Sequence, residues 1–164
     1  MSLFKSLIIM TLFIIPAINA QAQESNHQHQ KHLSKLLDHY MAAKDALIED
    51  DFETAQSSLS EFQKEASENE EMNHHEEHAK THQEHHAAMK KALKKAEAAE
   101  DIDNLRAAFS DISDHLAKAT ENLGYDEETL YLKYCPMANN NEGALWLSEQ
   151  EQIKNPYMAK TMSG

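Results

Sequence analysis

Three things are scarce in this sequence of 164 residues: cysteine, basic residues and long apolar runs. Cys135 is the only cysteine, and a single cysteine cannot form a disulfide within the chain. Lysine and arginine number 15 against 28 acidic residues, and the resulting net charge of −13 disfavours binding to nucleic acid or anionic lipid. The mean hydropathy of −0.69 argues against a membrane protein.

Sequence motifs of common enzymes are missing as well. The sequence has no Cys-x-x-Cys pair, no recognisable hydrolase motif and no glycine-rich phosphate-binding loop. We therefore expect a binding protein rather than an enzyme. An enzymatic alternative would have to use the single thiol, paired with histidine, as a nucleophile or redox centre.

The one apolar run lies at the N-terminus. Lys5 precedes the run at residues 7–15, and small residues follow at Ala20 and Ala22. This pattern is typical of a secretory signal peptide, and the run is too short to span a bilayer as a mature anchor. We predict a signal peptide over residues 1–22, cleaved near Ala20 or Ala22, and a periplasmic or secreted mature protein without stable membrane insertion.

The rest of the sequence predicts one helical domain over residues 32–164, preceded by a disordered polar tail at residues 23–31. Apolar residues at three- and four-residue spacing, or a high content of strong helix formers, indicate four helices. These stretches are residues 32–50, 52–66, 73–99 and 102–123. Because the links between them are short, we predict an all-α, up-and-down four-helix bundle.

Past Gly124 the periodicity changes. Residues 129–134 and 144–147 favour short strands, and an Asn-rich turn at residues 139–143 separates them. The sequence therefore predicts a short C-terminal β-hairpin, which we expect to cover one end of the bundle.

The third helical stretch carries histidines where a bundle would place leucines. At 100° per residue, six side chains fall within an arc of about 100°, which we call the histidine stripe. They are His75, His78, His82, His85, His86 and Met89. Imidazoles on adjacent turns can share one metal ion, and imidazole suits copper(II) and zinc. A neutral histidine in a dry core would leave a ring nitrogen unpaired at a cost of about 1–3 kcal/mol, so the stripe contacts either metal or water. The alternative is a solvated, His- and Glu-rich low-complexity segment.

The C-terminal stretch holds a second candidate metal site. Cys135 and Met137 flank a proline, which restricts the local backbone. A thiolate and a thioether are soft donors that favour copper(I). His115, on the fourth helix, is our candidate for the third ligand, and Met158 and Met162 could act as auxiliary thioethers. The alternative is that Cys135 is a buried, packed thiol.

Three blocks of this stretch closely resemble the signature of a bacterial extracytoplasmic family, domain of unknown function 3347. The blocks are Tyr134-Cys135-Pro136-Met137-Ala138, Gly143-Ala144-x-Trp146-Leu147-Ser148 and Ile153-x-Asn155-Pro156-Tyr157. The resemblance extends from about Leu33 to the C-terminus. Members stand alone or are fused to periplasmic adaptor subunits of heavy-metal efflux pumps, so the resemblance implies metal handling, with copper as the first choice. In the family pattern a Cys-Gly pair often follows the third block, but this chain lacks it, so a sulfur-rich site here needs methionine, histidine or a partner.

These features predict a heavy-metal-binding protein that acts as a buffer or chaperone in metal resistance or efflux. We expect copper(I) at the Cys-Pro-Met motif, copper(II) or zinc at the histidine stripe, and an efflux adaptor subunit as a partner. Two alternatives remain open: a structural domain that docks on the adaptor without binding metal, and a thiol-dependent enzyme.

Overall fold

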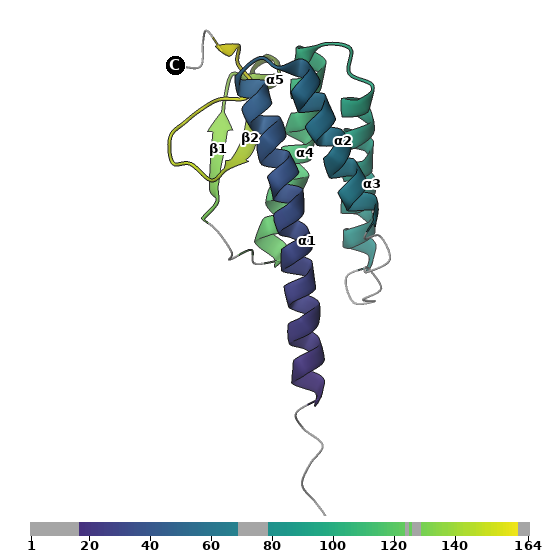
Figure 1. Ribbon diagram of the computed structural model, residues 1–164. Helices are drawn as coiled ribbons and strands as arrows, with labels where there is room; N and C mark the ends of the chain where they lie inside the picture. The colour runs from purple at the N-terminus through teal and green to yellow at the C-terminus, as the bar shows by residue number, and fades with distance from the viewer. Residues whose placement is uncertain (1–16, 69–78, 124, 126–128, 161–164) are drawn as a thin grey trace, which may run out of the picture.

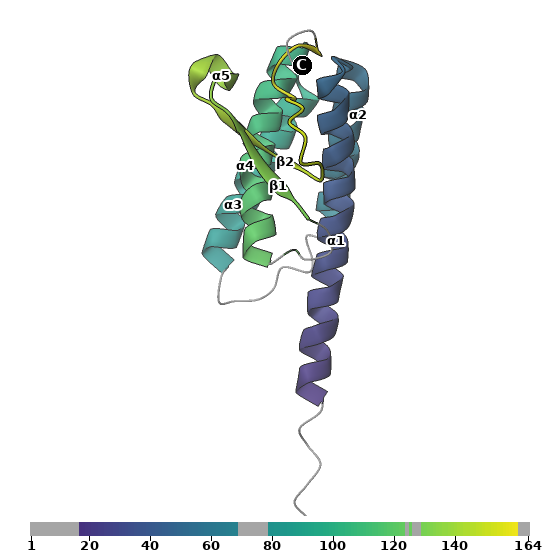
Figure 2. The same cartoon turned by 90° about the vertical axis from the view of Figure 1, so that its left-hand side faces the viewer.

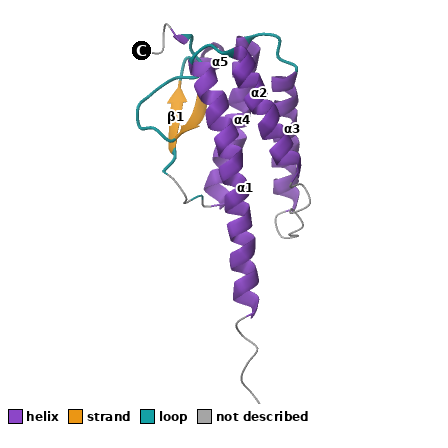
Figure 3. Ribbon diagram, viewed as in Figure 1, coloured by secondary structure: helices purple, strands orange, loops and turns teal. Residues whose placement is uncertain are grey.

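The computed structural model describes residues 17–68, 79–123, 125 and 129–160. Its main body is a bundle of four helices that alternate in direction (Figure 1). They are α1 (Ala17–Ile48), α2 (Phe52–Glu68), α3 (Ala79–Glu97) and α4 (Ile102–Leu123). A two-stranded sheet follows them, which confirms the predicted all-α, up-and-down bundle with a short C-terminal hairpin (Figure 3).

The first helix begins earlier than the sequence predicts. Its 32 residues start at Ala17, so residues 23–31, predicted to be a disordered tail, belong to a continuous helix that extends beyond the other three (Figures 1 and 2). Alanine and glutamine are good helix formers, and adding residues to an existing helix costs far less than nucleating a new one. Most of the predicted signal peptide falls on residues 1–16, outside the described part. Within that part, no helix is long and apolar enough to cross a membrane.

Short links with capped helix starts connect the bundle. The Asp51 carboxylate accepts the N–H of Thr54 at 3.0 Å at the start of α2, and the Asp101 carboxylate accepts the N–H of Asn104 at 2.8 Å at the start of α4. Each aspartate satisfies a backbone donor that the first helical turn leaves unpaired. Asp50, with φ of 60°, ends α1 in the left-handed region that commonly terminates helices.

The apolar stripes of the helices meet in one core. The largest fully buried side chains on the helices include Tyr40, Phe62 and Phe109, and the Tyr40 and Phe109 rings stack with 4.8 Å between their centroids. Cys135 and Trp146 from the C-terminal region belong to the same core. The C-terminal segment is therefore part of the domain and not an appendage.

The hairpin consists of β1 (Tyr131–Cys135) and β2 (Ala144–Ser148), paired antiparallel with Cys135 opposite Ala144. It lies along the side of the bundle, with β2 against α4 (Figure 2). Our expectation that it covers one end of the bundle is therefore wrong. The reason is that the Tyr40 hydroxyl, on α1, bonds to the backbone of β2.

The Asn-rich turn forms α5 (Ala138–Asn141), which is short and largely left-handed, since Asn139, Asn140 and Asn141 have φ of 50°, 57° and 71°. Asparagine adopts this region more readily than any other residue except glycine. Gly143 follows with φ of 86°, and a Cβ atom added there would overlap the Tyr134 ring. Backbone conformation and close approach both require glycine at this position.

Candidate functional site

The structure describes part of the histidine stripe. His75 and His78 lie outside the described residues, and His82, His85 and His86 occupy the first turns of α3. Because α3 is continuous from Ala79, these three positions precede Met89 by seven, four and three residues and share its side of the helix.

The side of α3 that carries Met89 faces the core. Met89 is half-buried and packs against the core, and Leu93 and Ala96, further along the same side, are buried. The line of the histidine stripe thus continues along α3 as a row of core-facing side chains, Met89, Leu93 and Ala96, which we call the seam of α3. The histidine positions are the N-terminal extension of that seam.

One histidine at this end of the bundle was not identified from the sequence. His32 Nδ1 on α1 lies 3.2 Å from the Glu65 carboxylate on α2, and Lys35 Nζ lies 3.2 Å from the same oxygen. Burial raises the pKa of Glu65, but the hydrogen bonds from His32 and Lys35 outweigh it and hold the pKa below its usual value. The ionised carboxylate orients the ring through Nδ1, as carboxylates do for many metal-bound histidines. The two residues are 33 positions apart, so only the antiparallel pairing of α1 and α2 reveals the contact.

The two sulfurs of the Cys-Pro-Met motif lie in different environments. Cys135, the last residue of β1, is 4% exposed and belongs to the core, whereas Met137 is 61% exposed. The thiol therefore faces the core and the thioether is open to solvent. This burial is what the packed-thiol alternative for Cys135 requires.

The other candidate ligands are dispersed. His115 is half-buried on α4, Met158 is half-buried against the core, and Met162 lies outside the described residues. Within residues 17–68, 79–123, 125 and 129–160, no group of three or more His, Cys, Asp or Glu side chains could hold a metal ion.

A buried hydrogen-bond network joins the hairpin to the bundle. The Tyr40 hydroxyl lies 2.7 Å from Ser113 Oγ and accepts the N–H of Leu147 at 3.1 Å. Since the Ser113 hydroxyl donates to the carbonyl of Phe109 at 2.8 Å, the proton of Tyr40 points to Ser113. Burial is the main cause of a strongly raised pKa for Tyr40, which keeps its proton.

Tyr157 completes this attachment. Its hydroxyl donates to the carbonyl of Leu145 at 2.6 Å, and its ring lies 5.9 Å from both the Phe109 and the Trp146 rings. Burial raises the pKa of Tyr157 as well. Together, Tyr40 and Tyr157 bond to the edge of β2 that is not paired with β1, and so close that edge of the sheet.

Arg106 anchors the C-terminal segment to the turn between α1 and α2. This buried guanidinium donates to the carbonyl of Pro156 at 2.9 Å, to the carbonyl of Leu47 at 3.0 Å and to the Asp50 carboxylate at 2.6 Å. Asp50 also accepts the N–H of Lys160 at 2.9 Å, and this bond, followed by that from Arg106, holds the pKa of the Asp50 carboxyl below its usual value. The Asn-Pro-Tyr block thus has a structural task.

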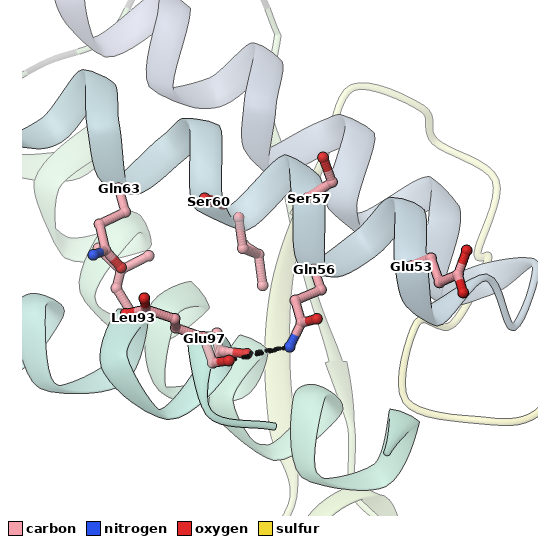
Figure 4. Close-up of a pocket in the computed structure, with 9 residues that line it drawn as sticks. Glu53, Gln56, Ser57, Ser60, Gln63, Leu93 and Glu97 are labelled. Carbon is pink, nitrogen blue, oxygen red and sulfur yellow. Dashed lines mark hydrogen bonds between the residues drawn. The ribbon is translucent and has the colours of Figure 1, made fainter. Parts of the chain in front are cut away.

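A groove of about 370 Å³ lies between α2 and α3 (Figure 4). Its lining is mainly polar and comprises Glu53, Gln56, Ser57, Leu59, Ser60, Gln63, Leu93, Ala96 and Glu97. Gln56 spans the groove and donates to the carbonyls of Ala96 at 3.1 Å and Ala99 at 3.0 Å. It thereby adds a donor to carbonyls at and just beyond the C-terminal end of α3, and none of the predicted metal ligands lines the groove.

A family model described as protein of unknown function (DUF3347) matches residues 36–128. The chain belongs to this family. The match confirms the resemblance noted in the sequence, although it covers only the second part of α1 together with α2, α3 and α4, and ends before β1. No curated protein and no solved structure matches the chain.

Membership in DUF3347 divides the candidate ligands into two groups. The histidine stripe and His115 lie within the matched residues, whereas Cys135 and Met137 lie beyond them. The two candidate metal sites of this DUF3347 chain therefore need separate tests.

Proposed function

We propose that this DUF3347 protein binds a heavy metal in the cell envelope, with copper as the expected ion, and buffers or transfers it in metal resistance or efflux. The main support is the seam of α3, in which Met89, Leu93 and Ala96 face the core and histidines extend the same line. The proposal assigns copper(II) or zinc to this stripe, namely His75, His78, His82, His85, His86 and Met89.

The chemistry of the seam supports a ligand. Imidazole is polar and cannot replace leucine in a dry core without a partner for its ring nitrogens. Histidines three and four residues apart present ring nitrogens on successive turns, a spacing that suits one shared ion. A net charge of −13 also raises the local concentration of cations around the chain.

The first experiment addresses the histidines. We expect the variant in which His75, His78, His82 and His85 are all glutamine to bind copper(II) or zinc more weakly than the original protein, with nearly unchanged helicity. Affinity of the original protein should fall as the pH drops through about 6.5, because imidazole binds metal only when it is neutral. His39→Gln, on α1 and outside the stripe, is the matched control.

Isothermal titration at two pH values measures both effects, and the metal content of protein purified without an affinity tag gives the bound ion. Affinity that responds neither to pH nor to the four substitutions would mean that the stripe is a solvated segment. Protein that neither carries nor binds metal would favour the alternative of a structural domain that docks on an efflux adaptor.

A second site is proposed for copper(I), with Cys135 and Met137 as soft donors and His115 as the third ligand. Because Cys135 is buried and Met137 is exposed, binding at this site requires the end of β1 to rearrange. Cys135→Ser should lower copper(I) affinity more than zinc affinity, and Met137→Leu and His115→Ala should lower it to a smaller degree. Competition against a copper(I) chelator measures this, and equal affinity in all variants would leave Cys135 as a packed thiol.

The proposed role is binding and not catalysis. A thiol nucleophile must meet its substrate as an accessible thiolate, and the burial of Cys135 in the core disfavours that contact. A periplasmic efflux adaptor subunit is the proposed protein partner, on the strength of the domain fusions that the family resemblance implies.

A further inference from the structure

The exposed large apolar side chains of the described residues all belong to the C-terminal region. Leu132, Tyr134, Met137 and Ile153 are 61–71% exposed, whereas the large apolar helix side chains whose burial is described are buried or half-buried. Leu132 and Tyr134 are two residues apart on β1 and therefore share one face of the strand. Exposed apolar side chains that gather on one strand face, and are not scattered singly, make that face a candidate interaction site.

The two edges of the hairpin differ. Leu147 N–H and the Leu145 carbonyl point away from β1, because they bond to the hydroxyls of Tyr40 and Tyr157. In an antiparallel pair the residues opposite them, Leu132 and Tyr134, then also point their N–H and C=O groups away from the partner strand. No hydrogen bond to these four groups is present among the residues that the structure describes. One edge is closed and the other is open.

We propose that β1 accepts an extended, basic segment of a partner protein as a third strand. The open edge supplies the backbone hydrogen bonds, and Leu132 and Tyr134 supply the apolar contact for alternate side chains of the incoming strand. This inference does not depend on metal binding.

The charge around β1 indicates what the partner carries. Residues 129–152, which include the hairpin, contain three acidic residues, Glu142, Glu149 and Glu151, and one lysine, in a chain whose net charge is −13. That lysine, Lys133, already donates to the carbonyls of Gln150 at 2.6 Å and Glu151 at 3.1 Å, and also to that of Gln152. Lysine or arginine on the incoming strand would complement the acidic surroundings.

The same charges disfavour a second copy of this chain. Suppose that two copies pair antiparallel along β1, with Leu132 of each copy opposite Tyr134 of the other. Lys133 of one copy then lies directly opposite Lys133 of the second copy. Like charges directly opposite in a sheet are destabilising, and the net charge of −13 on each copy would repel the other copy.

The test uses the full chain and the synthetic peptide Lys-Val-Lys-Val-Lys-Val-Lys. We expect it to bind and to slow amide hydrogen exchange at Leu132 and Tyr134 by about tenfold, while the Leu147 amide is already slow in the free protein because Tyr40 bonds it. A peptide of the same composition in blocks, four lysines and then three valines, should give no such protection. The alternating glutamate–valine peptide should not bind.

Variants locate the contact. Leu132→Pro removes an N–H that points away from β2, so it should weaken peptide binding about tenfold while the pairing of β1 with β2 persists. Leu132→Lys keeps the N–H but replaces the apolar contact with a like charge, and should weaken binding as well, so the test does not depend on how Leu132→Pro folds. Ile153→Ser, which removes an equally exposed side chain outside the strands, should bind as the original protein does.

Three results would overturn the proposal. The first is failure of the alternating basic peptide to bind, and the second is equal protection by the block peptide, which would mean adhesion by charge alone. The third is a dimer in sedimentation whose Leu132 and Tyr134 amides are protected without peptide, which would identify a second copy as the occupant of the edge.

Discussion

Removing the hydroxyl of Tyr40 should loosen the attachment of the hairpin to the bundle. Tyr40→Phe deletes the contact with Ser113 at 2.7 Å and leaves the buried N–H of Leu147 without its acceptor. A net hydrogen bond is worth about 1 kcal/mol, and an unsatisfied buried donor costs about 1–3 kcal/mol. We therefore expect Tyr40→Phe to lower the free energy of unfolding by about 3 kcal/mol.

A double-mutant cycle isolates the shared hydrogen bond. Ser113→Ala should cost about 1–2 kcal/mol, because Tyr40 loses the acceptor of its proton. The double variant should cost about 1 kcal/mol less than the sum of the single variants, since both remove the same bond. Tyr131→Phe, on the half-buried part of β1, is the control and should change stability by less than about 0.5 kcal/mol.

Urea unfolding followed by circular dichroism gives these free energies, provided that the slope with denaturant is unchanged. A loss below about 0.5 kcal/mol for Tyr40→Phe, or strict additivity with Ser113→Ala, would refute the reasoning. Either result would mean that the hydroxyl does not hold the edge of β2 in solution.

Three further variants test the anchors of the C-terminal region. A lysine at position 106 cannot make both hydrogen bonds, to Pro156 and to Asp50, that the guanidinium makes. Arg106→Lys should therefore lower the free energy of unfolding in urea by about 3 kcal/mol and expose the C-terminal segment to proteolysis. Resistance to protease equal to that of the original protein would contradict this. Gly143→Ala should cost about 2 kcal/mol, because φ is 86° and the Tyr134 ring is in contact, and adding Tyr134→Ala should recover part of this loss; a neutral Gly143→Ala would refute both causes. The pKa of Asp50 is lowered in the folded state, so its contribution is complete above pH of about 4 and is lost as the pH falls through the lowered value; Asp50→Asn should flatten the acid side of a plot of urea midpoint against pH, and an unchanged slope would contradict the pairing.

The sequence predicts the bundle well because apolar spacing within each helix is local information. The predicted hairpin also agrees with β1 and β2 to within two residues at each strand boundary. The place of the hairpin could not be predicted, because it depends on the bond between Tyr40 and Leu147, which are 107 positions apart. The early start of α1 was missed because residues 23–31 lack an apolar period, although they are compatible with a helix.

For the candidate ligands too, local spacing along one element was predictable and the tertiary position was not. The histidine stripe follows from spacing on one helix, and the core-facing side of α3 agrees with that pattern where its side chains are described. For Cys135 and Met137, a spacing of two would place both sulfurs on one face of a continuing strand. However, β1 ends at Cys135, so the thiol is buried and the thioether is exposed. The alternation of side chains between two faces applies only within a strand, so it does not predict where residues beyond the end of the strand point.

Metal binding on α3 and strand addition at β1 would occur at separate places on the molecule. The histidine positions lie at the N-terminal end of α3, and the hairpin lies along the opposite side of the bundle, against α4 (Figure 1). Histidine substitutions in the stripe should therefore leave protection of the Leu132 amide by the basic peptide unchanged, and Leu132→Lys should leave copper(II) or zinc affinity unchanged. If instead metal changed peptide affinity, thermodynamic linkage would require the peptide to change metal affinity by the same factor. Because α4 contacts both α3 and β2, it offers the most direct route for such a coupling.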